Sequence, residues 1–457
     1  TFPRVFYLRP DLRRVTATAD ADPGSRPRAS SGPPVSPPRR PRDHHTKPYP
    51  LYAMSEHYDV VVAGGGPAGL QFARELGERT DYAVAVLEAN EALADNDKST
   101  GGTFHQVIAG FDVPADVVMS SNPDVIFEGP DASARLAIPN YVLDFPAFLE
   151  FLGEDAADRG VDVRTGHRVT GPAVEDGQVT GVTCRQRGES GETRVSADLV
   201  VDATGPAGTL TRELGMWDRE AAQRGIGKEY EVEGRFDADA MLFRFDHDAA
   251  PGGYAWTFPA GDGVFKAGVC WIDDFYARHS PPDDGSIDDY VERWVARDPR
   301  WESGSVRAVH AGEARSDNSL NRRADDGILA VGDAVSSINP LFGEGIRPAM
   351  ESARMAADAA IAALDAGDVS RERLASYERR WNREKGPKWK TQRVVGELLY
   401  DFTPGQQNRF VRAADGMSPA QLDRLQRYDL TTGDLLELYP AAPRDLLKVP
   451  RLLRHAR

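Results

Sequence analysis

A glycine-rich turn at residues 64–69 constrains the fold of this chain more than any other feature of its sequence. The apolar run 58–63 predicts a strand buried on both faces, and it leads directly into Gly-Gly-Gly-Pro-Ala-Gly. Apolar residues at helical spacing follow, and a second apolar run, 83–87, ends at Glu88. A strand, a glycine turn, a helix, a second strand and an acid within about thirty residues indicate a dinucleotide-binding unit.

The residues of this turn have separate tasks in such a unit. Gly64 permits the tight turn, Gly66 lets a pyrophosphate approach the backbone, and Gly69 lets the helix pack closely on the strand. The start of the helix offers free N–H groups and the positive end of its dipole to the phosphates. Glu88 stands at the end of the second strand, where it can accept hydrogen bonds from ribose hydroxyls.

A second motif stands far along the chain. Residues 327–334 predict a strand that ends in Gly-Asp, and the loop 339–346, Asn-Pro-Leu-Phe-Gly-Glu-Gly-Ile, leads into an alanine-rich helix. Asp333 at a strand end can bind ribityl hydroxyls, and the loop can bring backbone N–H groups to the polar edge of a flavin ring. The first unit alone does not separate NAD from FAD, but the two motifs together indicate FAD.

A third element lies between the two motifs. Residues 197–205 predict a strand that ends in Ala-Thr-Gly, and Gly205 would let the chain pass close to the nucleotide. The predicted fold class is therefore α/β, with a Rossmann-like FAD-binding domain, an inserted α+β substrate-binding domain and a helical C-terminal region. The expected extents of these three parts are 54–205 with 310–366, 206–309, and 367–457.

The first 53 residues differ in composition from the rest of the chain. They carry ten Arg or Lys against four Asp or Glu, whereas residues 54–457 carry 45 against 67. Their proline- and arginine-rich runs have no apolar period and cannot bury enough surface to offset the entropy of ordering. We expect 1–53 to be disordered and to lie upstream of a true start at Met54. A genuine disordered arm is the alternative.

Composition also excludes several classes of function. A net charge of −16, with only eight Lys against 47 Arg, is typical of proteins from salt-loving archaea and disfavours a nucleic-acid partner. Cys184 and Cys270 are too few for a four-cysteine zinc site or an iron–sulfur cluster, and no His-Glu-x-x-His occurs, so we expect no metal. No apolar run reaches about 18 residues, so no transmembrane helix is expected.

The segment 252–270 narrows the assignment. Gly-Gly-Tyr-Ala-Trp-Thr-Phe-Pro is followed there by Gly-Val-Cys at 268–270. The three FAD motifs in this order resemble the glutathione-reductase and p-hydroxybenzoate-hydroxylase type of flavoprotein. The added segment resembles the Tyr-x-Trp-x-Phe-Pro and Gly-x-Gly segments of the geranylgeranyl reductase family. This resemblance covers about 54–400. It implies an FAD-dependent oxidoreductase that reduces C=C bonds of an isoprenoid, either a geranylgeranyl lipid or the side chain of a polyprenyl quinone.

The resemblance assigns FAD contacts to residues of this sequence. Ala68 and the glycines beside it would touch the pyrophosphate, and Glu88 the ribose. Gly101 and Gly102 occupy the position of the family's flavin-contacting loop, and Val169 would meet the adenine through its backbone. The ribityl chain and the ring would be held by the second motif: Asp333, Gly343, Gly345 and Ile346.

The chain departs from the family pattern at three positions. Archaeal members usually have a cysteine where this sequence has Thr100, so a proton-donor or redox role of a thiol does not transfer to it. Phe145 stands where the family tends to have Arg, and Cys270 replaces the last glycine of Gly-x-Gly. These departures bear on the substrate more than on FAD.

The implied reaction determines what the protein must supply. An isolated alkene needs a hydride from reduced flavin at one carbon and a proton at the other. Tyr254, Trp256 and Phe258 alternate along a predicted strand and so share one face, which either lines the isoprenoid site or belongs to the core. His105 could donate the proton near neutral pH, or it is a structural or surface histidine. The catalytic candidates are His105, Tyr254 and Trp256.

The electron donor and the reaction type stay open at this point. No second glycine fingerprint occurs, so the electron donor is either transiently bound NAD(P)H or a carrier such as ferredoxin. The FAD motifs also fit a monooxygenase acting on an aromatic or polyprenyl compound. A non-redox enzyme resembling lycopene cyclase, or a flavin electron carrier without turnover, would share the same motifs.

The C-terminal tail bears on location. Residues 444–457 alternate basic and apolar residues, and a basic amphipathic tail can lie on anionic lipid. Packing of this tail on the acidic body is the alternative. The expected location is the cytoplasm, with peripheral contact at the inner face of the cell membrane as an option.

Overall fold

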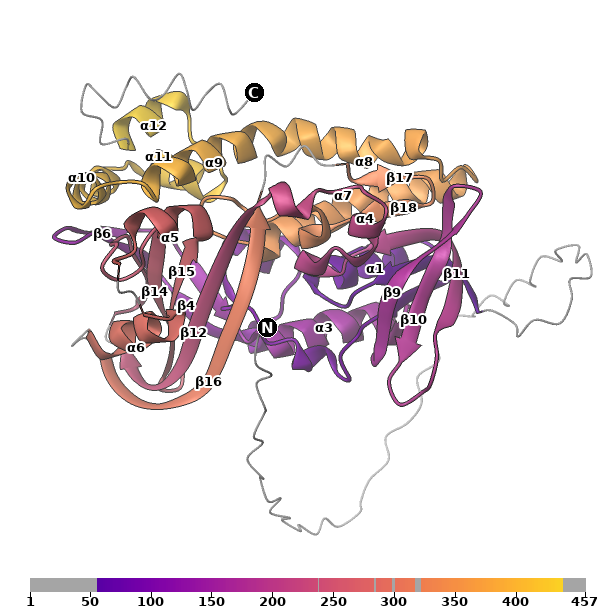
Figure 1. Ribbon diagram of the computed structural model, residues 1–457, viewed down its shortest axis with the longest axis horizontal. Helices are drawn as coiled ribbons and strands as arrows, with labels where there is room; N and C mark the ends of the chain where they lie inside the picture. Colours follow the sequence, from indigo (N-terminus) through magenta and orange to yellow (C-terminus); the bar gives the residue numbers. More distant parts are fainter. Residues whose placement is uncertain (1–55, 237, 283–284, 298–300, 317–321, 439–457) are drawn as a thin grey trace, which may run out of the picture. The chain divides into compact units, whose positions relative to one another are not determined.

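The apolar runs of the sequence pair into three β-sheets (Figure 1). The structure is a computed structural model that describes residues 56–236, 238–282, 285–297, 301–316 and 322–438. The predicted N-terminal arm 1–53 and the basic tail 444–457 lie outside these described residues.

The first sheet has eight strands and contains the glycine-rich turn. Its strand order is β17-β18-β11-β1-β2-β8, and β10 and β9 extend it from β11. Neighbours in the series β18-β11-β1-β2-β8 are parallel. The strands are β1 (His57–Ala63), β2 (Val84–Leu87), β8 (Asp162–Arg164), β9 (His167–Glu175), β10 (Gln178–Gln186), β11 (Thr193–Asp202), β17 (Ala324–Asp325) and β18 (Ile328–Ala330).

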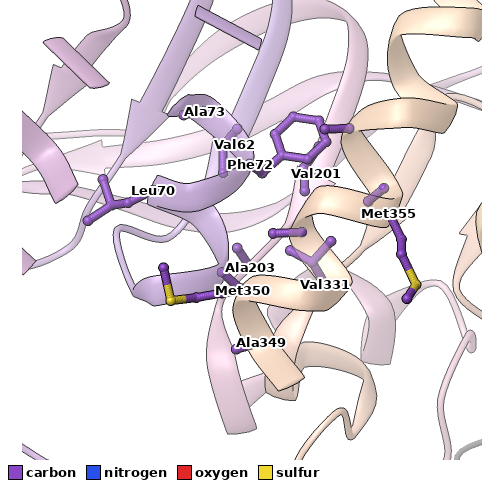
Figure 2. Packing of buried hydrophobic residues seen from close by; sticks show 14 of the residues in the cluster. Val62, Leu70, Phe72, Ala73, Val201, Ala203, Val331, Ala349, Met350 and Met355 are labelled. Carbon is purple, nitrogen blue, oxygen red and sulfur yellow. The ribbon is translucent and has the colours of Figure 1, made fainter. Parts of the chain in front are cut away.

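Both faces of the parallel strands are covered, which explains their uninterrupted apolar sequences. One face packs on helices α1 (Pro67–Arg79), α3 (Phe145–Asp158) and α7 (Ile346–Asp365). In Figure 2, Val62 and Val201 lie among side chains of α1 and α7. The other face, which includes Val61, packs against β9 and β10. The predicted α/β class with a parallel sheet is what the structure has.

The second sheet has seven strands in the order β16-β12-β15-β14-β13-β5-β6. They are β5 (Asp124–Glu128), β6 (Ser133–Leu136), β12 (Gln223–Phe236), β13 (Ala240–Arg244), β14 (Gly253–Pro259), β15 (Val264–Ile272) and β16 (Trp301–Ser316). A third, three-stranded sheet has the order β3-β7-β4, formed by β3 (Gly102–Phe104), β4 (Val118–Asn122) and β7 (Asn140–Leu143).

Strand pairing departs from the domain limits expected from the sequence. β5 and β6 belong to the second sheet although they fall within 54–205, and β16 continues past residue 309. β5 pairs in parallel with β13. A segment expected to belong to the FAD-binding domain is therefore a strand of the second sheet, which was expected to belong to the substrate-binding domain. The chain therefore crosses between the sheets more often than a single insertion would require.

Helices cover the second sheet and complete the C-terminal region. Those not yet named are α2 (His105–Gly110), α4 (Thr209–Glu213), α5 (Asp273–His279), α6 (Ile287–Arg297), α8 (Arg371–Glu384), α9 (Gly386–Leu399), α10 (Pro404–Asp415), α11 (Pro419–Gln426) and α12 (Thr432–Leu438). The short 3-10 turns are η1 (Leu93–Asp95), η2 (Ala115–Val117), η3 (Gly205–Ala207), η4 (Arg219–Ala221) and η5 (Gly332–Val335). Within the described part of the chain, no helix has both the length and the apolar character needed to span a bilayer.

The C-terminal helices are tied to both large sheets. Trp381 of α8 and Trp389 of α9 are buried, and the Arg323 guanidinium lies 4.0 Å from the Trp381 ring centroid. At the other end, α10 lies beside β6 (Figure 1), and the Asn408 side chain accepts a 2.8 Å hydrogen bond from the Asp131 backbone. The region predicted to be helical is helical over its described residues.

Gly69 offers a direct test of the close packing in the first unit. A Cβ at Gly69 would lie 2.0 Å from the Gly64 carbonyl oxygen and 3.1 Å from Ala203 Cβ. We expect Gly69→Ala to lower the free energy of unfolding by at least about 2 kcal/mol, because the backbone must move apart. Gly110→Ala, where a Cβ would meet no atom within 4 Å, is the control in urea unfolding. Equal stability of the two variants would contradict this account.

Candidate active site

The turn between β1 and α1 forms an open backbone cradle. Gly64 has a φ of +109°, and a Cβ there would lie 2.4 Å from the Ala203 carbonyl oxygen, so only glycine fits. Gly66 is extended, and a Cβ on it would meet no atom within 4 Å. Among the residues that the structure describes, no side chain caps the start of α1. A cradle of this kind, at an uncapped helix N-terminus, fits a pyrophosphate.

Glu88 is fixed at the end of β2 by the same turn. Its Oε2 accepts a 2.8 Å hydrogen bond from the Gly65 backbone, and its Oε1 accepts one of 2.8 Å from Asn90. The carboxylate therefore stands beside the cradle and helps to hold its shape. The predicted ribose contact of Glu88 stays a prediction, and this position supports it.

The second motif touches the first. Gly332, with a φ of +59°, begins η5, and a Cβ on it would lie 2.8 Å from Ala68 Cβ in α1. Asp333 follows, and its Oδ2 lies 3.9 Å from the position of a Cβ on Gly345. Ile346, the first residue of α7, is buried in the same apolar cluster as Ala68. Segments about 265 residues apart thus meet at one place, as the sequence motifs required.

Asp333 carries a polar atom that lacks a partner. Its Oδ1 is buried and accepts no hydrogen bond from the described residues. Burial raises the pKa of the Asp333 carboxyl to about 6, and the Ile338 backbone opposes this shift. A buried carboxylate oxygen without a donor is costly in a native fold, so it fits a hydroxyl-bearing ligand such as a ribityl chain.

Asp202 is a residue of the third element that sequence reasoning missed. It ends β11, is fully buried, and accepts hydrogen bonds from Thr204 through both backbone and hydroxyl. It also accepts bonds from the Leu210 and Thr211 backbones, of 3.0 and 2.8 Å. These bonds fix the turn that contains Gly205. The signal was present, because an aspartate at a strand end with a threonine two residues later favours such a turn.

The loop around Gly101 and Gly102 joins the first unit to the second sheet. We name residues 97–104 the flavin loop, after the contact that the family resemblance predicts for it. Gly101 has a φ of +76°, and a Cβ on it would lie 2.3 Å from the Leu143 carbonyl oxygen. A Cβ on Gly102 would lie 2.7 Å from Phe258 Cε2. The flavin loop therefore packs directly against the Tyr-Trp-Phe-Pro strand, β14.

Tyr254 joins the same strand to the second flavin motif. Its hydroxyl donates a 2.7 Å hydrogen bond to the Phe342 carbonyl and lies 3.5 Å from the position of a Cβ on Gly343. Burial raises the pKa of Tyr254 well above its usual value. Its hydroxyl hydrogen is thus held by a carbonyl group, so Tyr254 orients the loop. Its role as a proton donor stays a prediction that this geometry does not favour.

Trp256 explains why Gly268 follows the aromatic segment. The two residues face each other on β14 and β15, and a Cβ on Gly268 would lie 2.3 Å from Trp256 Cζ2. Because Gly268 has no side chain, the indole can extend across β15 to β12, and Trp256 Nε1 donates a 2.7 Å hydrogen bond there to Glu229 Oε2.

Cys270 faces Tyr254, and burial raises the pKa of its thiol to about 12. The thiol therefore stays protonated.

Three further residues named from the sequence have no contact with Tyr254 or Trp256 in the described structure, or are buried in the core. His105 is exposed at the start of α2, with its ring centroid 6.4 Å from that of Tyr141, and no described contact joins it to Tyr254 or Trp256. The Val169 side chain, on β9 of the first sheet, is buried in an apolar cluster, so any adenine contact is left to its backbone. Phe145 is buried at the start of α3. The catalytic roles stay predictions.

Arg347 links the second flavin motif to the end of the described chain. It is buried at the start of α7 and donates hydrogen bonds of 2.7 Å to the Gln426 carbonyl and 3.2 Å to the Tyr428 hydroxyl. It also pairs with Glu344 at 3.0 Å. Helix α11 and the residues after it therefore hold the loop that carries Gly343 and Gly345.

Comparison with known proteins gives one consistent group. Residues 118–424 match the family model for tryptophan halogenase. The chain is 36% identical to the digeranylgeranylglycerophospholipid reductase of Haloferax volcanii, over 82% of this chain and 96% of that protein. Among solved structures, a geranylgeranyl bacteriochlorophyll reductase-like protein of Thermoplasma acidophilum has a TM-score of 0.75 at 21% identity, covering 87% and 100% of the chains. The flavin-dependent brominase Bmp2 has a TM-score of 0.64 at 18% identity, covering 86% and 99%.

The orphan oxygen of Asp333 predicts a pH dependence of cofactor binding. The ionised carboxylate accepts hydrogen bonds from ligand hydroxyls, so FAD affinity should fall as the pH drops through about 6 and the group is protonated. Asp333→Asn should weaken binding roughly tenfold and remove this pH dependence. Titration calorimetry across this pH range measures both effects. Asp198→Asn, on the exposed part of β11, is the control, and a matching loss in it would reject the assignment.

The contact between Gly268 and Trp256 predicts a packing defect. Gly268→Ala should cost about 1–3 kcal/mol of stability, because its Cβ meets both the indole and the Lys228 carbonyl oxygen, at 2.6 Å. Gly227→Ala is matched to it, since a Cβ there lies 3.5 Å from Cys270 Cβ and 3.6 Å from the same indole. Urea unfolding and tryptophan fluorescence of both variants check the difference. Native-like stability of Gly268→Ala would overturn the explanation.

Proposed function

Because this chain belongs to the protein family of the tryptophan halogenase model and, within it, to the FAD-dependent geranylgeranyl reductases, we propose that its substrate is a digeranylgeranylglycerophospholipid. The chain is an FAD-dependent oxidoreductase that reduces C=C bonds of an isoprenoid. The phospholipid is the substrate named for the relative that is 36% identical over nearly its whole length. This match favours the reductase over the monooxygenase, cyclase and electron-carrier hypotheses.

The aromatic environment of β14 is the observation that carries the substrate assignment. Tyr254, Trp256 and Phe258 belong to one apolar cluster, which the flavin loop contacts through Gly102. Phe243 continues it, with ring centroids 5.2 Å from Phe258 and 5.7 Å from Tyr254. The cluster then extends to rings of β5, of α10 and of the segments that follow β13, η5 and α9: Phe127, Phe410, Phe245, Phe342 and Tyr400. These rings form a mostly buried apolar cluster that excludes water, and we infer that the isoprenoid chain binds beside it.

The residues of the two motifs would hold the cofactor. The 64–69 cradle would bind the pyrophosphate, Glu88 the ribose and Asp333 the ribityl chain, while Gly102 and Gly343 bring their loops to the ring. FAD supplies, when bound and reduced, the hydride that adds to one carbon of the double bond. The β14 aromatic side chains orient the isoprenoid against the ring.

The proposal also states where the enzyme meets its substrate and what reduces FAD. A phospholipid with two geranylgeranyl chains resides in a bilayer, and no described helix can span one. We therefore expect the enzyme to take its substrate at the membrane surface. The donor that reduces FAD is NAD(P)H or a small electron carrier, and anaerobic mixing of the oxidised enzyme with each one separates the two.

Mass spectrometry of a defined lipid tests the proposal. Purified enzyme, with FAD reduced by dithionite under nitrogen, is mixed with vesicles that contain the unsaturated phospholipid. We expect the lipid to gain two hydrogen atoms per double bond, and Trp256→Phe, which loses the Glu229 hydrogen bond, to slow the gain. Vesicles with the fully saturated lipid are the control. Saturation of a polyprenyl quinone but not of the phospholipid would reject the substrate.

A further inference from the structure

Three arginine side chains are buried in the described part of the chain, and one of them has no carboxylate partner there. Arg74, Arg323 and Arg347 are 4%, 0% and 2% exposed. Arg74 pairs with Asp155, and Arg347 pairs with Glu344 at 3.0 Å. No carboxylate of the described residues pairs with the Arg323 guanidinium, which therefore carries a positive charge without a counter-charge.

Burial cannot remove the charge of Arg323. A guanidinium stays protonated in proteins, whereas a buried Lys or His can lose its proton. An unpaired ion in the interior is costly, so buried charges are found beside an opposite charge. A negative partner is therefore required close to Arg323.

Aromatic rings stabilise only the flat face of this guanidinium. Its Cζ lies 4.0 Å from the Trp381 ring centroid and 6.0 Å from that of Tyr377. Arg347 has the same kind of contact, 3.9 Å from the Tyr428 ring centroid, and yet has a carboxylate as well. Ring contacts contribute less than the cost of burying an unpaired ion, and they leave the N–H groups in the guanidinium plane unused.

Three buried nitrogen atoms at this place have no acceptor among the described residues. They are Arg323 Nε, Arg323 Nη2 and Trp381 Nε1. Because Arg323 stacks on the Trp381 ring, these donors belong to one contact. The indole of Trp389 differs, since its Nε1 donates to the Ser337 and Ile338 carbonyls at 3.1 and 2.9 Å. Buried donors without acceptors are rare in folded proteins, so they indicate a bound acceptor.

The remaining contacts of the guanidinium are with uncharged groups. Arg323 Nη1 donates hydrogen bonds of 3.0 Å to Ser337 Oγ and 3.3 Å to the Tyr377 hydroxyl. Ser337 Oγ is the acceptor in this bond, so its own hydrogen can serve a further acceptor. Glu378 Oε2 accepts a 2.9 Å hydrogen bond from the Arg323 backbone, and in the described structure it forms no ion pair with the guanidinium.

The contacts of Arg323 extend to the second flavin motif. Its carbonyl accepts a 2.9 Å hydrogen bond from the Ala330 backbone, at the end of β18. Ser337, which Arg323 Nη1 holds, donates a 3.1 Å backbone hydrogen bond to the Gly332 carbonyl at the start of η5. An uncompensated charge at Arg323 would therefore destabilise the strand and the turn that place Asp333.

The missing partner must be a small acceptor with a single negative charge. The place offers one positive charge and several donors, so a doubly charged anion would exceed what it can neutralise. Arg323 and Trp381 are both fully buried, so the ligand must be enclosed completely. A water molecule could accept the hydrogen bonds but would leave the charge unopposed. Chloride meets all of these conditions.

We propose that Arg323 and Trp381 bind a chloride ion, which neutralises the guanidinium and accepts hydrogen bonds from Arg323 Nε, Arg323 Nη2 and Trp381 Nε1. The ion is a structural ligand that joins α8 to the segment around β17, which lies beside it (Figure 1). Through Ser337 it also supports the turn that carries Asp333. The ion takes no part in the redox reaction, so this inference does not depend on the substrate.

Anomalous diffraction from crystals of the FAD-loaded enzyme grown in sodium bromide locates the ion directly. Bromide has the charge of chloride and nearly its size. We expect an anomalous peak at hydrogen-bond distance from Arg323 Nη2 and Trp381 Nε1. Water at this position, with no anomalous signal, would overturn the proposal. This test uses the wild-type chain and stays decisive where a variant does not fold.

Thermal unfolding of the FAD-loaded enzyme measures binding in solution. Sodium chloride replaces sodium gluconate at constant ionic strength, so charge screening is unchanged, and gluconate is too large for an enclosed site. An ion that binds only the folded state stabilises it, so the wild-type melting temperature should rise by a few degrees and then saturate. Arg323→Met should lose this rise, because the charge that binds the ion is gone.

Arg74→Met is the matched control, since Arg74 is also buried but has its own carboxylate. It should keep the chloride-dependent rise of the wild type. An equal rise in Arg323→Met and Arg74→Met would reject Arg323 as the site. A bromide peak without any chloride dependence in solution would mean binding at crystal concentration only, and would reject the ion as a structural ligand.

Discussion

The close approach of three glycine backbones holds the two halves of the FAD site together, and the rest of the structure depends on it. Gly64 lies against Ala203, Gly69 against Gly64, and Gly332 against Ala68, each at a distance that leaves no room for a side chain. These contacts bring the ends of β1, β11 and β18 into register at one edge of the parallel sheet. Asp202 ends β11, Asp333 follows β18 and Glu88 follows the neighbouring β2, so three acids stand at the carboxyl ends of these parallel strands.

Much of the first sheet could be predicted because its signals are local. Glycines, apolar runs and Glu88 stand within about thirty residues, and Asp333 repeats the pattern far along the chain. FAD as the cofactor and the isoprenoid reductase family are confirmed by the comparisons. The contacts assigned to individual residues, Val169 and Ile346 among them, stay predictions, since they concern a ligand and not the fold.

The second sheet could be predicted only in part, because long-range pairing decides it. The alternation of Tyr254, Trp256 and Phe258 indicated one face, and their shared cluster agrees with it. Nothing local to β5 signals that it pairs with β13, more than a hundred residues away. For the same reason, the contacts of Glu229 with its neighbours could not be predicted from the sequence. These residues meet only when β12, β15, β16 and the flavin loop are assembled. Glu229 looks like an ordinary surface charge in the sequence, and so does Arg323.

The hydrogen bonds between Arg347 and the segment around Tyr428 have a consequence for synthesis of the protein in the cell. A growing chain on the ribosome presents the 64–69 turn about 360 residues before Gln426 and Tyr428, which hold its partner loop through Arg347. At about 5–20 residues per second, many seconds separate the two events. The loop that carries Gly343 and Gly345 therefore lacks its Arg347 contacts while the first unit is already made, and its final placement is a late event of chain synthesis.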